Sequence, residues 1–100
     1  MTSYVIAYYG EPKFKNPEEG VGYMKRWKEW MSSLGGALVN PGVPLKKGKT
    51  ISSSAVSDNN DPQRLTGYSM VQADSLDAVV EMVKTCPHLE HGTVDVAETM

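Results

Sequence analysis

The 100-residue chain contains a single cysteine, Cys86, and no run of apolar residues long enough to cross a membrane. A lone thiol excludes an intrachain disulfide and is typical of proteins kept in a reducing cytosol. A membrane helix needs roughly 18 or more apolar residues, and the N-terminal stretch lacks the basic start of a secretion signal. We therefore expect a cytoplasmic protein that makes no use of a membrane.

An excess of charge of either sign is also lacking. Ten Lys and Arg against twelve Asp and Glu leave a net charge of −2 and a pI near 5.6. A nucleic-acid-binding domain usually has a pI above about 9, so that class is not expected. Hydrophobic residues at 40% and charged residues at 22% are ordinary for a globular domain. The length suits one domain, residues 1–100.

Two segments have the spacing of an amphipathic helix. Asn16 is a favourable N-cap before Pro17, and Gly35-Gly36 ends the segment. Asp74 is the expected N-cap of the second helix, which Cys86-Pro87 closes. The apolar stripes are Val21, Met24, Trp27, Met31 and Leu34 in the first helix, and Leu76, Val79, Val80 and Val83 in the second.

Four further segments are predicted to be strands, because β-branched, aromatic or alternating residues lie between turn signals. They cover residues 4–9, 37–40, 65–73 and 92–98. Residues 49–57 fit either an edge strand or one arm of a hairpin. The resulting order, β-α-β-β-α-β, predicts an α+β, ferredoxin-like fold in which two helices cover one face of an antiparallel sheet.

The first strand carries apolar and aromatic side chains on both of its faces. Two helices can cover only one face of four strands, so the other face needs a different cover. A second copy of the chain is the interpretation we favour, which predicts a homodimer. The alternative is an uncovered, half-polar face that tolerates a few aromatic residues. The side chains of the first strand that we assign to one face are those of Tyr4, Ile6 and Tyr8, and those on the other face belong to Val5, Ala7 and Tyr9.

Several segments resemble the YCII-related family, including its larger branch of DGPF-domain proteins. The strand Tyr4–Gly10, the helix start Pro17–Glu19 with Trp27 and Trp30, and the strand Gly67–Val71 match it, and the run from Ser75 to Val96 carries most of the likeness. The resemblance implies a ferredoxin-like fold paired into a dimeric α+β barrel. The Asp-Gly-Pro-Phe motif is absent, however, and the first helix contains no histidine, so the resemblance transfers no catalytic residue.

His88 is the candidate for acid–base chemistry. It follows Pro87 at a chain reversal, and an imidazole titrates near pH 6.5, which suits proton transfer if a carboxylate such as Asp61 or Asp95 orients it. The alternative is a surface or capping histidine that binds the last carbonyls of the helix. His88 and His91 lack the further ligands that a zinc site needs, so no metal and no cofactor are expected.

Tyrosines on two neighbouring strands could line a pocket, because each combines an apolar ring with a polar tip. We select Tyr9 and Tyr68 as ligand-binding candidates, with Trp30 at the margin of the helix stripe as a possible roof. The alternative is that they are core or interface residues. Two functions remain open: an acid–base enzyme of isomerase or lyase type acting on a small molecule, and a non-catalytic ligand-binding or interaction module on the same dimeric scaffold.

Overall fold

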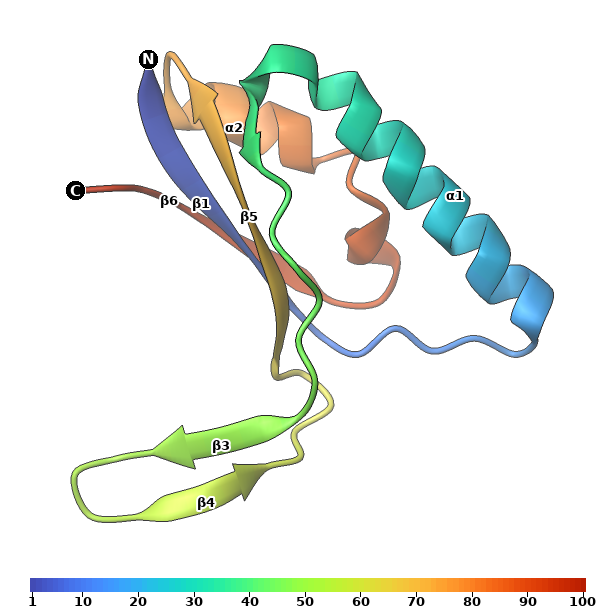
Figure 1. Cartoon of the computed structure of the whole chain (residues 1–100), viewed down its shortest axis with the longest axis vertical. Coiled ribbons are helices and arrows are strands. Elements are labelled where there is room, and N and C mark those ends of the chain that lie inside the picture. The colour runs from blue at the N-terminus through green and yellow to red at the C-terminus, as the bar shows by residue number, and fades with distance from the viewer.

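A computed structural model describes all 100 residues of the chain, and its helices and strands follow the predicted order (Figure 1). Four strands form the main sheet and two more form a separate hairpin. The strands are β1 (Thr2–Tyr9), β2 (Leu38–Asn40), β3 (Gly48–Ile51), β4 (Val56–Asn59), β5 (Leu65–Ala73) and β6 (Thr93–Glu98). The helices are α1 (Pro17–Leu34) and α2 (Leu76–Val83), with short 3-10 turns at Gly35–Ala37 and Pro87–Glu90.

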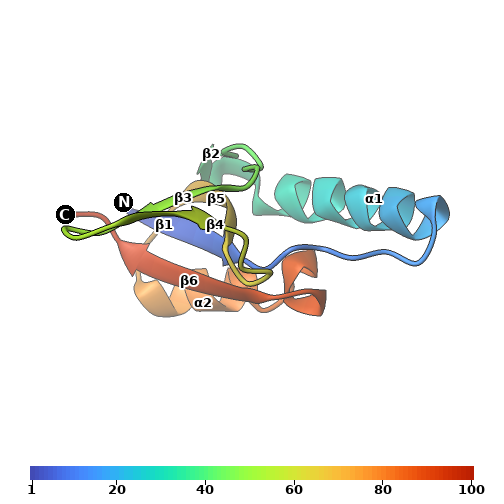
Figure 2. The same ribbon diagram turned by 90° about the horizontal axis from the view of Figure 1, so that it is seen from below.

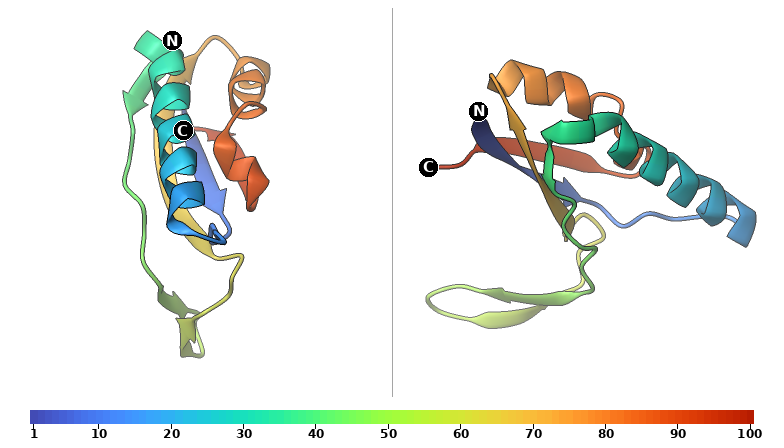
Figure 3. Two further views of the ribbon diagram at one scale, coloured as in Figure 1. Left: turned by 90° about the vertical axis from the view of Figure 1, so that its right-hand side faces the viewer. Right: turned by 45° about the horizontal axis from the view of Figure 1, so that its top comes forward.

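The main sheet has the strand order β2-β5-β1-β6, and all three pairings are antiparallel. Both helices lie on the same side of it, as the two views in Figure 3 show. This arrangement confirms the predicted α+β, ferredoxin-like fold. It follows from strand alternation, because β1 and β5 each direct one row of side chains toward the helices and the next row away from them.

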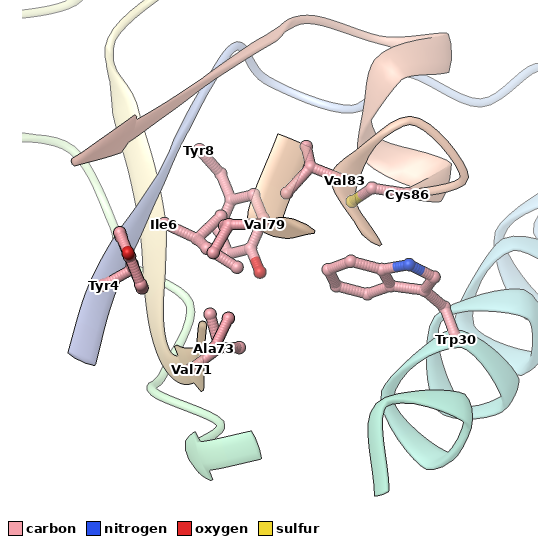
Figure 4. Packing of buried hydrophobic residues seen from close by; sticks show 9 residues of the cluster. All are labelled: Tyr4, Ile6, Tyr8, Trp30, Val71, Ala73, Val79, Val83 and Cys86. Carbon is pink, nitrogen blue, oxygen red and sulfur yellow. The ribbon is translucent and has the colours of Figure 1, made fainter. Parts of the chain in front are cut away.

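The core lies between the sheet and the helices. Ile6, Val71 and Val79 are fully buried at its centre, and Trp30 extends from α1 toward Val83 (Figure 4). Burying side chains of this size stabilises the fold by about 1.5–3 kcal/mol each. The opposite row, which includes Val5, Ala7 and Met70, is half-buried and has no element packed over it.

Three local predictions need correction. Leu76 and Val80 of the stripe predicted for α2 are exposed, and the residues that α2 buries are Val79 and Val83. The apolar stripe predicted for α1 includes Val21 and Met24, but both are exposed, and the residues that α1 buries are Tyr23 and Trp30. The helix turns its aromatic side toward the core because aromatic rings bury more area than valine or methionine. The N-cap of α2 is Ser75, whose Oγ accepts from the Ala78 amide, and not the preceding aspartate.

Residues 49–57, predicted to be a single edge strand or one arm of a hairpin, instead span parts of both strands of a hairpin and the turn between them; we call this hairpin the hairpin arm. Strands β3 and β4 pair only with each other, Ile51 opposite Val56, and project away from the main sheet (Figure 1). Seen from below, the hairpin lies in front of the sheet (Figure 2). The Lys49 ammonium binds the Asp58 carboxylate at 2.6 Å. Almost every residue of the arm is exposed, so it adds nothing to the core. No helix of the chain is long and apolar enough to span a membrane.

Candidate functional site

A cleft of about 690 Å³ lies between α1 and the segment 41–45. Its floor is the helix-facing side of β1 and β5, which contributes Tyr8, Gly67 and Ser69. Helix α1 forms one wall with Tyr23, Met24, Trp27, Lys28 and Met31, and Pro41–Leu45 form the other. Glu11, Arg64 and His88 also line the cleft. This volume is within the usual range for small-molecule sites.

The wall opposite α1 is held against β5 by main-chain contacts. The Leu45 amide donates a hydrogen bond to the Thr66 carbonyl at 2.9 Å, and Pro44 forms an isolated antiparallel β-bridge with Gly67. Gly42 has φ +70°, and a Cβ atom built there would lie 1.7 Å from the Tyr68 carbonyl oxygen. Only glycine permits this approach, so the wall depends on the residue type at position 42.

A chain of hydroxyl groups connects the floor of the cleft to the same wall. Tyr8 donates to Ser69 Oγ at 2.9 Å, and Ser69 donates to the Pro41 carbonyl at 2.8 Å. Burial raises the pKa of Tyr8, so the phenol stays protonated at neutral pH and keeps this direction of donation. The Tyr8 ring also packs edge-on against Trp27 at 5.0 Å between centroids.

His88 is only 3% exposed and lies in the turn after α2, where Cys86 and Pro87 are also buried. Its Nε2 is 2.8 Å from the Tyr9 carbonyl oxygen. A carbonyl can only accept, so Nε2 carries a proton and the neutral ring holds its lone pair on Nδ1, which forms no hydrogen bond within the chain. Gly92 makes the contact possible, since a Cβ there would lie 1.9 Å from the same carbonyl oxygen.

The structure does not bring a carboxylate to His88. Asp61 lies in an exposed turn, where its side chain accepts from the Gln63 amide at 2.9 Å. Asp95 is exposed on β6, opposite Ala7, and therefore on the side of the sheet away from the helices. The expected orienting group is thus replaced by the main-chain carbonyl of Tyr9, which fixes the tautomer without adding negative charge.

The three residues predicted to bind a ligand lie in different places. Tyr9 follows Tyr8 on β1, so its side chain is on the uncovered face and it does not line the cleft. Tyr68 bounds the cleft where it contacts Gly42. Trp30 is buried in the core, where its indole N–H donates to the Met82 carbonyl at 3.1 Å. The tryptophan that lines the cleft is Trp27.

Arg64 is a cleft residue that no pattern in the sequence indicates. It is 9% exposed and binds Glu11 Oε2 through Nη1 at 3.2 Å, which holds the pKa of Glu11 below its usual range. In the sequence it is one cation at the end of a turn-rich stretch, and no spacing distinguishes it from a solvated residue. Its role depends on a contact across 53 positions of the chain.

Two buried polar atoms, Arg64 Nε and Tyr23 Oη, have no hydrogen-bond partner in the chain. Both residues line the cleft. Unpaired buried polar atoms are rare in folded proteins, because each costs about 1–3 kcal/mol. Their occurrence at one cleft marks it as the place where this chain has unused hydrogen-bonding capacity. No three His, Cys, Asp or Glu side chains are grouped so that they could hold a metal ion.

Fold and site together define a small α+β protein with an open, largely apolar cleft that contains one buried arginine and one buried histidine. No protein-family profile matches the chain, and no curated protein matches it. Among solved structures it is similar to 5-chloro-2-hydroxyhydroquinone dehydrochlorinase (TftG) from Burkholderia phenoliruptrix AC1100, in complex with 2,5-dihydroxybenzoquinone. The TM-score is 0.61 at 14% identity, over 98% of this chain and 93% of that chain.

The likeness covers nearly the whole of both chains, so it supports the fold derived from the strand order. At this identity it extends to the fold and to no individual side chain. The resemblance to the YCII-related family has no matching family profile behind it, while the ferredoxin-like fold that it implied for a single chain is present.

Proposed function

We propose that the chain binds a ring-sized organic molecule in the cleft and catalyses a proton-transfer reaction of isomerase or lyase type, in which His88 accepts the proton at Nδ1. The observation that carries the proposal is the histidine itself, buried at the cleft with Nε2–H fixed on the Tyr9 carbonyl. A neutral imidazole with one free lone pair is a suitable general base near neutral pH.

The composition of the cleft supports this class of substrate. Tyr8, Trp27 and Met31 provide apolar surface that a planar ring can contact, while Arg64 and His88 provide polar groups at its edge. The structurally similar dehydrochlorinase is named for a chlorinated hydroxyhydroquinone and is bound to a dihydroxybenzoquinone, both of which are single rings bearing hydroxyl groups.

A non-catalytic binding module is the second candidate. It is favoured by the absence of a carboxylate beside His88, because an imidazole without such a partner gains no extra stabilisation when it becomes protonated. In this case the cleft binds the same kind of ligand, and His88 only supports the turn through its bond to Tyr9.

The two candidates are separated by measuring turnover and binding together. We expect the chain to release chloride from 5-chloro-2-hydroxyhydroquinone, and His88→Gln to lower kcat by about 10²-fold or more, as loss of a general base does. Glutamine keeps an N–H that can donate to the Tyr9 carbonyl, so the turn is retained. His91→Gln, at the only other histidine, is the matched control and should keep kcat within about threefold.

Equal rates for the wild-type chain and His88→Gln would refute the catalytic role. If the chain binds 2,5-dihydroxybenzoquinone but releases no chloride and exchanges no substrate hydrogen with deuterated solvent, the binding module is the correct function.

We also propose that two copies of the chain pair through the uncovered face of the main sheet. Val5, Ala7 and Met70 form an apolar row at its centre, and no element of the same chain lies over them. The same face of a second copy would cover it in a pair related by a twofold axis, which is the commonest symmetry of soluble oligomers.

A further inference from the structure

Arg64 is a fixed group at the edge of the cleft. Its amide donates to the Asp61 carbonyl at 3.0 Å, and its carbonyl accepts from the Gly10 amide at 2.9 Å, so the main chain is held on both sides. The side chain is only 7% exposed, and it lines the cleft. A guanidinium held in this way presents its donors in one direction without further ordering.

The donors of Arg64 are only partly used. A guanidinium has five N–H groups. The Nη1 group contacts Glu11 Oε2 at 3.2 Å and the Asp61 carbonyl at 3.4 Å. Nε is buried without a partner, and Nη2 forms no hydrogen bond in the chain. The unused donors therefore lie together on the Nε–Nη2 edge, which is the edge that binds a carboxylate through two parallel hydrogen bonds.

The charges around the cleft fit a single negative charge. The charged side chains in its lining are Lys28, Arg64 and Glu11, so their sum is 2 − 1 = +1. Glu11 binds on the Nη1 side and uses neither donor of the Nε–Nη2 edge of Arg64. A monoanion balances this charge, whereas a phosphate dianion would exceed it and would face the Glu11 carboxylate as well.

We propose that the Nε–Nη2 edge of Arg64 binds the carboxylate of an aromatic acid whose ring lies in the apolar part of the cleft against Trp27. The inference rests on the proposed function for the location of the ligand, but it does not depend on catalysis by His88. The unpaired Tyr23 Oη in the same lining is a second polar group available to such a ligand.

Benzoate and benzamide test the proposal, because they have the same shape and differ in charge. We expect the wild-type chain to bind benzoate about tenfold or more tightly than benzamide, as a bidentate ionic contact requires. In Arg64→Gln the ratio of benzoate affinity to benzamide affinity should fall to about one. The affinity for benzamide should stay within about twofold of the wild-type value, which would show that the cleft is intact. Lys25→Gln, at an exposed cation of α1 that does not line the cleft, is the matched control and should change the ratio of benzoate to benzamide affinity by less than about threefold.

Glu11→Gln gives a second test that does not remove the arginine. Loss of this carboxylate leaves the positive charge of Arg64 without its partner. Benzoate should therefore bind about threefold or more tightly than it binds the wild-type chain, while the affinity for benzamide is unchanged. A wild-type ratio near one would overturn the proposal, as would an unchanged ratio in Arg64→Gln or Glu11→Gln, or no binding of either compound up to about 10 mM.

The outcome is independent of the proposed catalysis. Selective benzoate binding together with a fully active His88→Gln variant would support the carboxylate site and refute the proton-transfer role. Chloride release with no preference for benzoate would give the reverse result.

Discussion

At the scale of single residues, the position of the cleft wall formed by residues 41–45 depends on Gly42. Its φ of +70° is unfavourable for other residues, and a Cβ would lie 1.7 Å from the Tyr68 carbonyl oxygen. We therefore expect Gly42→Ala to lower the free energy of unfolding by about 2–4 kcal/mol, through backbone strain and displacement of the segment 41–45. Urea denaturation measures this loss.

Gly36→Ala is the control for that substitution, because nothing lies within 4 Å of a Cβ built there and its φ is not positive. Its effect should stay within about 0.5 kcal/mol. Equal stability of the two variants would show that the close approach at Gly42 does not constrain the fold.

Cys86 makes stability depend on pH in the alkaline range. Burial raises the pKa of its thiol from 9.0 to about 11, so the folded chain holds this proton over a range where the unfolded chain releases it. Its contribution is therefore complete below pH 9 and is lost as the pH rises toward about 11, by up to about 1.4 kcal/mol per pH unit. Urea denaturation between pH 8 and about 11 tests this slope.

Cys86→Ala supplies the reference, because it removes the thiol while keeping every other titrating group. Tyr8 and Tyr23, whose pKa values are also raised by burial, contribute to the alkaline slope of both proteins. The slope of the wild-type chain should therefore be the steeper one between pH 9 and about 11. Parallel curves would contradict a buried thiol at this position.

At the scale of the elements, the start of α2 depends on one side chain. Ser75 Oγ accepts from the Ala78 amide at 3.1 Å, whereas Asp74 makes no capping bond. Ser75→Ala should cost about 1 kcal/mol of unfolding free energy, and Asp74→Ala should stay within about 0.5 kcal/mol. Thermal unfolding of both variants measures the two losses. A larger loss in Asp74→Ala than in Ser75→Ala would show that the aspartate is the N-cap.

The fold could be predicted from the sequence because its signals are local. Asn16 caps α1 as expected, with its side chain accepting from the Glu19 amide, and the positions of the strands follow from alternation and turns. The choice between Asp74 and Ser75 could not be made, because both residue types cap helices well and only the path of the chain separates them.

The candidate site was less predictable, because its geometry depends on contacts between distant segments. The helix turns Trp27 toward the cleft and Trp30 into the core, although spacing alone favours the reverse. His88 could be selected from its place after a helix, but the partner that fixes its ring is a main-chain carbonyl 79 positions away. A main-chain acceptor has no signature in the residue types, and the same holds for the pairing of Arg64 with Glu11.

At the scale of the whole molecule, the uncovered face predicts a dimer. Light scattering at micromolar concentration should give twice the chain mass, 2 × 11.0 = 22 kDa. Val5→Lys places a charge at the centre of the apolar row and should yield monomers that retain their circular dichroism spectrum. Val80→Lys, on the exposed side of α2, is the control and should remain dimeric. A wild-type mass of one chain would refute the pairing.

The hairpin arm gives the molecule a region of separate stability. Strands β3 and β4 bond only to each other and bury almost nothing, so they can open without loosening the main sheet. The exposed Ser52–Ser54 tip is accordingly the natural place to cut the chain, lengthen it or insert a reporter sequence. A label carried there would follow the arm while the cleft, built entirely from other segments, keeps its shape.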